Sequence, residues 1–306
     1  MFNLIIQYKK KQLESAHKQD VLANFTIESP IPYSIDDVLT ELEKLDTEMV
    51  HGATAKDKQG PLYGKLTRFI QRLKSKQMDK RLNFIFNADK ALLEYDWFET
   101  LAEKLLDFGK SQGLKIIDFS EVPADILPLI TGLIGRLIFS IQQWMEDNKR
   151  HPIALFCDEA HLYLPNKIAE GMAVTGLNSF ERIAKEGRKY GVALIVISQR
   201  PADVNKTILS QCGNFIAMRL TNPEDQNVIR RLFPDNLEGF SDVLPILDVG
   251  EALVVGDASL LPSRIIINEP KIKPNSATIN FWDEWAKNKT EKGIKEAVEA
   301  LRRQHK

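Results

Sequence analysis

An apolar run that stops abruptly at two carboxylates is the strongest guide to the fold of this chain of 306 residues. Residues 153–157 read Ile-Ala-Leu-Phe-Cys, and Asp158 and Glu159 follow directly. A strand buried on both faces of a parallel sheet reads as a nearly continuous apolar run. Open α/β sheets bind their ligands beyond the carboxyl ends of such strands. The pattern therefore predicts an α/β sheet with an acidic site at the end of one strand.

A second apolar run stops in polar residues in the same way. Residues 192–197 read Val-Ala-Leu-Ile-Val-Ile, and Ser198, Gln199 and Arg200 follow. In ATPases the first pattern is the Walker B strand, whose Asp holds Mg²⁺ while an adjacent Glu polarises the attacking water. Two such strands joined by a helix favour an ATPase core. The alternative is an ordinary α/β sheet whose strands happen to end in charged residues.

The phosphate-binding loop that would complete an ATP site is not found in the sequence. Such a loop reads G-x-x-x-x-G-K-[ST]. In the stretch 60–67 the two glycines are one residue too close, and Leu66 replaces the hydroxyl residue. At Gly109-Lys110-Ser111 the triplet is correct, but Lys104 replaces the first glycine. Because this triplet follows a predicted helix, Gly109 is interpreted as a helix C-cap. The sequence thus contains the carboxylate half of an ATP site.

Composition narrows the class of protein further. The net charge of −1 provides no general attraction for DNA or for anionic membranes, so any nucleic-acid contact must be local. Cys157 and Cys212 are far apart and form no secreted disulfide framework. The longest apolar region, 126–141, is interrupted by Pro128 and Arg136 and predicts a buried helix rather than a membrane span. We expect a cytoplasmic protein without a membrane anchor.

The order of the predicted elements indicates an α/β fold with a mainly parallel sheet flanked by helices. We expect a helical subregion at 1–80, a core at 81–268 and a linker with a charged tail at 269–306. Two N-caps stand out, Ser34 and Asn222, the latter with Pro223 at the first helical position. The expected strands are 83–86, 114–119, 153–157, 192–197 and 215–220, followed by an antiparallel pair at 250–255 and 264–267. The expected long helices are 95–108, 123–148 and 178–190.

Several motifs in order resemble the HerA family of hexameric DNA-translocating ATPases, which is related to the FtsK-type DNA pumps. They are Asp158 to Pro165, Ile183 to Gly191, Ile197 to Pro201, Leu209 to Cys212 and Arg219 to Gln226. The similarity extends from about residue 25 to residue 285. It implies a RecA-like fold, a homohexameric ring, and ATP-driven movement along double-stranded DNA. It also implies a partner, commonly a nuclease that resects DNA ends or an effector in phage defence.

Full members of that family carry an N-terminal β-barrel and a Walker A loop ahead of the region that this sequence resembles. Neither is recognised in this sequence. We therefore expect the chain to correspond to the C-terminal portion of such a protein and to lack ATP turnover on its own. Two readings follow: a motor subunit whose other half lies elsewhere, and an assembly or regulatory module that keeps the fold without turnover.

The resemblance assigns roles to five residues. Asp158 would hold Mg²⁺, through water, and Glu159 would orient and deprotonate the hydrolytic water. Gln199 would sense the γ-phosphate of ATP. Arg188 would complete the site of a neighbouring subunit as an arginine finger, with Arg200 as a weaker candidate. The plain alternatives are a surface carboxylate for Glu159, a loop-capping amide for Gln199 and a surface ion pair for Arg188.

The remaining candidates are less specific. Arg182 is a weaker arginine candidate, and His161 is either a relay of nucleotide state or a packed histidine. The segment 165–178, which carries Lys167, Gly171 and Gly176, is either a DNA-contacting pore loop or a connector. A two-domain DEAH-type helicase is rejected, because no Ser-Ala-Thr motif follows the next strand and no arginine-rich motif lies near the end. A metalloprotease is rejected because H-E-x-x-H is not found.

Overall fold

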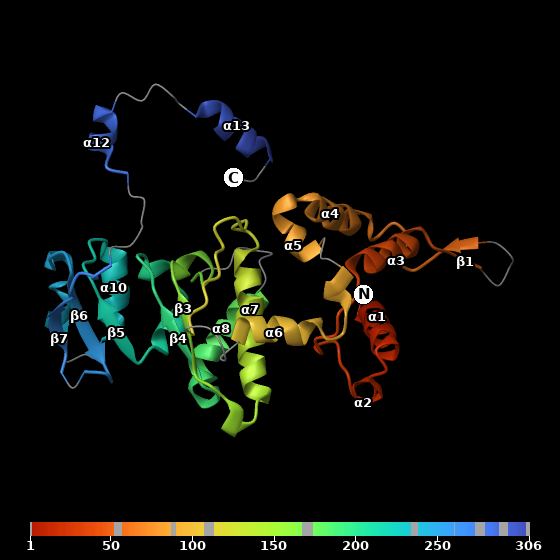
Figure 1. Ribbon diagram of the computed structural model, residues 1–306, viewed down its shortest axis with the longest axis horizontal. Helices are drawn as coiled ribbons and strands as arrows, with labels where there is room; N and C mark the ends of the chain where they lie inside the picture. The colour runs from red at the N-terminus through yellow and green to blue at the C-terminus, as the bar shows by residue number, and fades with distance from the viewer. Residues whose placement is uncertain are drawn as a thin grey trace. The chain divides into compact units, whose positions relative to one another are not determined.

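The chain is described by a computed structural model in which helices and strands alternate (Figure 1). The described residues are 2–51, 57–86, 90–106, 113–166, 174–233, 238–259, 261–272, 279–287 and 293–303. They form two compact units, one made of residues 1–122 with 300–306 and the other of residues 123–299. The expected α/β fold class is confirmed. The domain boundaries expected after residues 80 and 268 stay predictions.

The first unit is mainly helical. Its elements are α1 (Phe2–Ser15), α2 (Gln19–Leu22), α3 (Ile35–Thr47), β1 (Met49–His51), β2 (Asp57–Gln59), α4 (Thr67–Met78), η1 (Lys80–Leu82), α5 (Asn83–Phe86), η2 (Lys90–Leu93) and α6 (Trp97–Leu106). The side chain of Ser34 accepts a hydrogen bond from the Asp37 amide at the start of α3, so the predicted N-cap is confirmed. Leu42 of α3 and Ile70 of α4 belong to the small core of this unit.

Two predicted strands of this unit are wrong. Residues 83–86 form helix α5 directly after η1, where the Leu82 amide already bonds to the Asp79 carbonyl. Local hydrogen bonds satisfy the backbone amides and carbonyls there, so residues 83–86 do not need a neighbouring strand. Residues 114–119 are extended but pair with no strand in the described part of the chain, and Leu114 and Ile116 are exposed. The Asp118 side chain accepts a bond from the Ser120 amide and turns the chain instead.

The second unit carries the sheets. Its elements are α7 (Leu127–Trp144), η3 (Asp147–Lys149), β3 (Ile153–Cys157), η4 (Ala160–Leu162), α8 (Val174–Glu186), η5 (Gly187–Tyr190), β4 (Val192–Val196), η6 (Pro201–Asp203), α9 (Lys206–Ser210), β5 (Asn214–Ala217), α10 (Pro223–Leu232), α11 (Glu238–Ser241), η8 (Leu244–Ile246), β6 (Glu251–Gly256), β7 (Ser263–Ile266) and α12 (Phe281–Ala286). Helix α13 (Ile294–Arg303) spans the boundary between the units.

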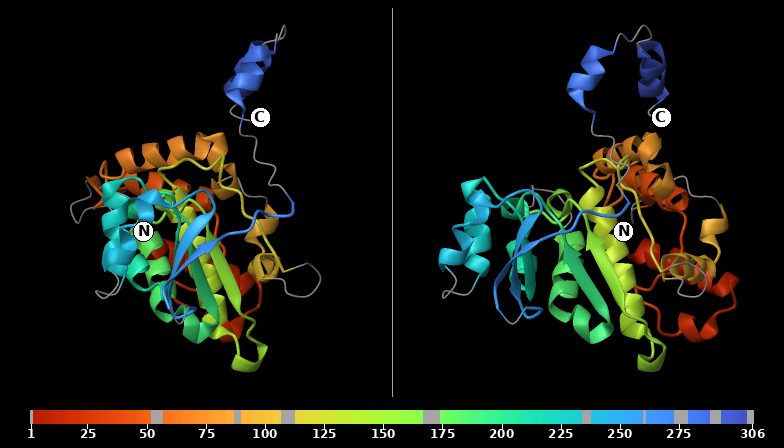
Figure 2. Two further views of the ribbon diagram at one scale, coloured as in Figure 1. Left: turned by 90° about the vertical axis from the view of Figure 1, so that its left-hand side faces the viewer. Right: turned by 60° about the vertical axis from the view of Figure 1, so that its left-hand side comes forward.

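Five of these strands form two sheets (Figure 2). Strands β3 and β4 are parallel, with Ile153 opposite Val192 and Cys157 opposite Val196. Strands β5, β6 and β7 form an antiparallel sheet in that order. The predicted antiparallel pair near the end of the sheet region is therefore confirmed, and β5 extends it to three strands. The Asn222 side chain accepts a bond from the Glu224 amide, which confirms the second predicted N-cap.

Helices α7 and α8 pack closely against each other and against one face of β3 and β4. The close approach depends on two glycines, because a Cβ added at Gly132 would lie 2.1 Å from the Cα of Gly176. Phe180 and Ile183 of α8 are buried beneath Cys157 and Val192 of the strands. The long helix and the helix after the carboxylates are thus confirmed, and together they fix where β3 ends.

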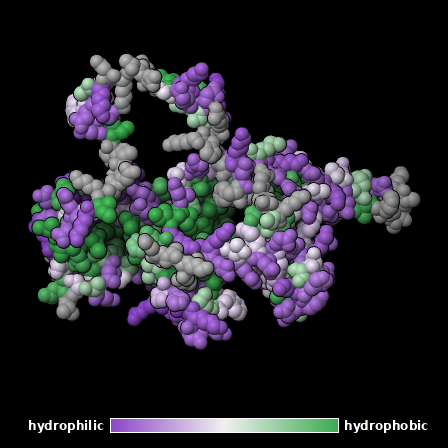
Figure 3. Space-filling model, in the orientation of Figure 1, coloured by the Kyte–Doolittle hydropathy of each residue, from purple (hydrophilic) through white to green (hydrophobic). Residues whose placement is uncertain are grey.

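Aromatic side chains gather on the exposed helix α12. The Trp285 ring lies edge-on to Trp282, with centroids 5.4 Å apart, and tilted against Phe281, with centroids 5.6 Å apart. Elsewhere, hydrophobic residues lie at the surface over β5, β7 and α7 (Figure 3). Among the helices that the structure describes, none has the length and apolar composition needed to cross a membrane.

Candidate functional site

The candidate site is built where β3 and β4 end side by side. The pairing continues past both strands, because the Ile197 amide donates to the Cys157 carbonyl at 2.9 Å and the Ala160 amide donates to the Ile197 carbonyl at 3.0 Å. This extension places the Asp158–Glu159 step directly beside residues 198 and 199. Two segments that are 40 residues apart in the sequence therefore face each other at one sheet edge.

The carboxylate of Glu159 is held by Gln199. The side-chain amide of Gln199 donates to Glu159 Oε1 at 2.9 Å. The backbone of Glu159 is left-handed, with φ +47° and ψ +44°, a conformation that is costly for a residue with a Cβ. The amide of Glu159 donates to Asp158 Oδ1 at 3.0 Å. The sharp turn therefore aims Glu159 across to the neighbouring strand, and the structure brings Glu159 and Gln199 together.

His161 lies on the other side of the Glu159 carboxylate. Its Nδ1 is 3.3 Å from Glu159 Oε2 and 3.2 Å from the hydroxyl oxygen of Ser198. Only 17% of the His161 side chain is exposed, against 38% of Glu159. Oε2 itself is buried and has no well-aligned hydrogen bond in the structure. The sequence allowed two interpretations of His161 and did not single out Ser198. A hydroxyl residue directly after the second apolar run could have indicated Ser198.

Asp158 faces solvent and can approach a hydrated cation. Its main-chain carbonyl accepts a hydrogen bond from the Tyr163 hydroxyl at 2.8 Å, which fixes the turn from below. In the described ranges no three His, Cys, Asp or Glu side chains converge on one point as a ready metal site. A magnesium ion at Asp158 would thus take most of its ligands from water and from phosphate oxygens, which is its usual preference. The donor set fits Mg²⁺ held through water.

The residues beneath the turn are neutral at ordinary pH. Burial raises the pKa of the Cys157 thiol to about 11. Burial, and next the adjacent Cys157, raise the pKa of the Tyr163 hydroxyl far above its usual range. These two groups therefore add no negative charge beneath the turn at ordinary pH.

The arginines do not join this cluster within one chain. Arg188 lies in η5, exposed, at the amino end of β4, so the length of the strand separates it from Glu159. The Arg200 guanidinium lies beside the site but pairs loosely with exposed Asp203, at 3.9 Å. Arg182 lies 4.8 Å from the centre of the Phe139 ring and near Glu186, which indicates a packing role. Lys167 and Gly171 lie outside the described residues, and Gly176 serves the α7–α8 contact.

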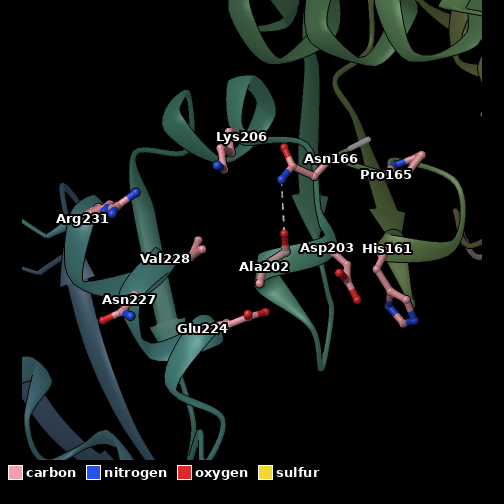
Figure 4. Close-up of a pocket in the computed structure, with 10 residues that line it drawn as sticks. All are labelled: His161, Pro165, Asn166, Ala202, Asp203, Lys206, Glu224, Asn227, Val228 and Arg231. Atoms are coloured by element: carbon pink, nitrogen blue, oxygen red, sulfur yellow. Dashed lines mark hydrogen bonds between the residues drawn. The ribbon is translucent and has the colours of Figure 1, made fainter. Parts of the chain in front are cut away.

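A polar pocket of about 570 Å³ adjoins the cluster (Figure 4). Its walls come from the segments that follow β3 and β4 and from helix α10, and they include His161, Lys206 and Arg231. The Ala202 amide donates to the buried carboxylate of Asp225 at 2.9 Å and so ties η6 to α10. Because the segments after β4 and β5 line one pocket, the carboxyl ends of these two strands lie at the same edge.

The fold and this edge define an α/β protein whose polar site lies at the carboxyl ends of parallel strands. The sequence profile of the family described as "Helicase HerA-like C-terminal" matches residues 138–290, half of the chain. The chain belongs to this family, and the expected resemblance is confirmed.

Curated relatives carry related names. A "DNA double-strand break repair helicase HerA" from Sulfolobus acidocaldarius is 28% identical over 269 residues, which cover 81% of this chain and 51% of that protein. The protein of the same name from Pyrococcus furiosus is 35% identical, over 71% of this chain and 45% of its own length. This chain thus spans about half the length of the curated relatives it matches.

Among solved structures, the genome packaging NTPase B204 of Sulfolobus turreted icosahedral virus 2, in complex with AMPPCP, is similar with a TM-score of 0.40 and 14% identity. The similarity covers 55% of this chain and 72% of that one.

Proposed function

We propose that this chain is the carboxylate-bearing half of an ATP-driven motor that moves along double-stranded DNA. The observation that carries the proposal is the Gln199–Glu159 hydrogen bond of 2.9 Å at the ends of two parallel strands. Membership of the HerA-like family and the names of the relatives support a DNA-associated activity.

The chain's own residues support a hydrolytic role for the cluster. Glu159 can take the proton of an attacking water, and Gln199 fixes its orientation. Asp158 is exposed and free to approach hydrated Mg²⁺. When bound, Mg²⁺ would neutralise the charge that develops on the phosphoryl group transferred from ATP. His161 stands behind Glu159 and limits how the carboxylate turns.

Assembly with other subunits would supply the arginine that a single chain does not bring to its own site. Arg188 is exposed at the opposite strand end, so it can act on ATP only from a neighbouring subunit. We propose a homohexameric ring in the cytoplasm that works in DNA end processing or phage defence with a partner nuclease or effector. A second candidate is an assembly or regulatory module of the same fold, favoured by the missing phosphate-loop sequence.

The test is Mg²⁺-dependent ATP hydrolysis with and without double-stranded DNA. It is measured on this chain and on a fusion to the part of the Pyrococcus furiosus relative that the chain does not match. We expect no turnover from the chain alone. In the fusion, Glu159→Gln should lower turnover by about 100-fold or more, since it removes the general base.

The matched control is Glu146→Gln, which neutralises an exposed carboxylate that only pairs with Lys149. It should leave turnover unchanged. Turnover of the fusion that is indifferent to Glu159→Gln would contradict the proposed role of this cluster. A folded fusion without any turnover would favour the regulatory module.

A further inference from the structure

A strongly basic segment lies in the first unit of this chain, whose net charge is −1. Residues 65–81 contain seven lysines and arginines and one acidic residue, Asp79. Most of the segment is helix α4, which is 12 residues long and contains no acidic residue. Its apolar side, with Leu66, Ile70 and Leu73, packs with α3 in the core of the unit (Figure 1). The charged side chains of α4 therefore lie on the surface.

One flank of α4 is neutralised by carboxylates of α3. Lys74 forms an ion pair with Glu43. At the start of the helix, the Asp46 carboxylate accepts hydrogen bonds from the Leu66 amide at 2.7 Å and from the Thr67 hydroxyl at 2.6 Å. The positive charge of Lys74 is therefore already matched within the unit.

The opposite flank of α4 carries cations that are not neutralised in this way. Lys65, Arg68 and Arg72 are spaced three and four residues apart, which places them on one side of a helix, and all three are exposed. Neither arginine forms an ion pair with a residue that the structure describes. The Lys65 ammonium donates to the Pro61 carbonyl, a neutral group, at 2.8 Å. We call Lys65, Arg68 and Arg72 the basic stripe.

We propose that the basic stripe binds the phosphate backbone of double-stranded DNA in a contact that does not depend on nucleotide. The inference rests on the proposed function, which makes duplex DNA the partner. Arg68 and Arg72 are four residues apart, which corresponds to about 6 Å along the helix axis. One strand of a duplex carries a phosphate about every 3.4 Å along its axis, so the two guanidinium groups can reach nearby phosphates of one strand.

The chemistry of the stripe suits phosphate better than it suits the bases. A guanidinium group presents a planar fork of donors that matches two phosphate oxygens. Contacts of this kind fix a protein on the duplex without reading its sequence. The stripe belongs to the first unit and the carboxylate cluster to the second, so we expect it to hold DNA whether or not ATP is bound.

An anionic membrane fits this helix less well than DNA does. An amphipathic helix binds a bilayer by burying its apolar face among the lipids. In α4 that face is already occupied, because Ile70 is buried in the core that the helix shares with α3. Only the charged flank is available, and it can make contacts with phosphate groups alone.

The test measures how the full chain binds a fluorescently labelled duplex of about 30 base pairs, by anisotropy without nucleotide, from about 50 to 200 mM salt. Arg68→Gln/Arg72→Gln removes two cations and keeps residues that favour a helix. Its affinity should be lower by about tenfold or more. The slope of log K against log salt should be shallower by about 1.8, since each phosphate contact contributes about 0.9.

Three further variants separate a local contact from a general effect of charge. Lys10→Gln/Lys44→Gln removes two exposed cations of the same unit, each paired with a glutamate on its own helix, and should leave the slope unchanged. Arg68→Lys/Arg72→Lys keeps both charges and should keep the slope of the wild type. Lys65→Gln lies before α4 and should reduce the slope by about 0.9, so the test does not depend on the double variant alone.

The absence of duplex binding overturns the inference, and so does a slope that the control lowers as much as Arg68→Gln/Arg72→Gln does. Vesicles of phosphatidylserine and phosphatidylcholine test the other anionic partner. Vesicle binding that Arg68→Gln/Arg72→Gln abolishes, together with unchanged duplex binding, also overturns the inference.

Failure of the inference and failure of the proposed function give different results. Duplex binding through the stripe, with a fusion to the Pyrococcus furiosus relative that does not hydrolyse ATP, supports the inference and counts against the proposed function. A fusion whose ATP hydrolysis depends on DNA, while the stripe variants bind duplex as the wild type does, supports the proposed function and overturns the inference.

Discussion

The amide nitrogen of Gln199 and the carboxylate of Glu159 meet at 2.9 Å although each ends a different strand. The contact joins a side-chain amide donor to a carboxylate acceptor. It therefore links the geometry of the turn after β3 to that of the turn after β4.

Replacing this amide by a second carboxylate should make stability depend on pH. Gln199→Glu places two like charges at hydrogen-bond distance, which should cost about 1 kcal/mol or more at pH 7.5. The cost should disappear near pH 4, where carboxyl groups in general take up protons. Urea unfolding at both pH values measures it. Gln199→Met, which has a similar length and no charge, should be insensitive to pH, and equal behaviour of the two variants would refute the contact.

The left-handed backbone of Glu159 leads to a second prediction. Glu159→Gly and Glu159→Ala both remove the carboxylate, but only glycine removes the steric cost of a positive φ. The glycine variant should be more stable than the alanine variant by about 1 kcal/mol in chemical denaturation. At exposed Lys185 inside α8 the order should reverse by a similar amount, because glycine is a poor helix former there. The same order at both positions would contradict the assigned conformation.

The contact between α7 and α8 leaves no room for a methyl group. Gly132→Ala should destabilise the chain by about 2 kcal/mol, since the added Cβ meets the backbone of Gly176 and one helix must shift. Gly239→Ala is the matched control, because a Cβ there meets nothing within 4 Å. Thermal unfolding followed by far-ultraviolet circular dichroism compares them. A Gly132→Ala variant as stable as the control would show that the helices are not this close.

The buried thiol of Cys157 predicts a loss of stability at alkaline pH. Its pKa is raised from 9.0 to about 11, so the folded state favours the protonated thiol. The stabilisation is fully present below pH 9 and is lost as the pH rises through 11. A shift of this size corresponds to roughly 2 to 3 kcal/mol. Unfolding free energies of the wild type and of Cys157→Val, measured from pH 8 to pH 11, should diverge by this amount; parallel curves would show a solvent-accessible thiol.

Sequence predicted best where local chemistry and burial agree. The caps Ser34 and Asn222 work through hydrogen bonds to amides two or three residues away, so they can be read without knowing the fold. The strands at 153–157 and 192–196 could be predicted because they are apolar throughout, as is typical of parallel strands packed against helices. A run of five residues is also short for a helix.

Predictions failed where pairing partners decide the outcome. Residues 83–86 and 114–119 have apolar patterns typical of strands, but a strand exists only if a neighbour supplies hydrogen bonds. In the candidate site, the strand ends that carry Glu159 and Gln199 could be predicted because both follow apolar runs. The position of His161 between Glu159 and Ser198 depends on the left-handed backbone of Glu159. A glutamate in the sequence does not indicate that conformation.

The aromatic cluster on α12 determines which optical signal can follow unfolding. Trp282 and Trp285 are 78% and 70% exposed, and Trp144 is 88% exposed. Three of the four tryptophans thus already experience water in the native state. Their emission should resemble that of indole in solution and shift little as the chain denatures, so intrinsic fluorescence would register almost nothing while the β-sheets come apart.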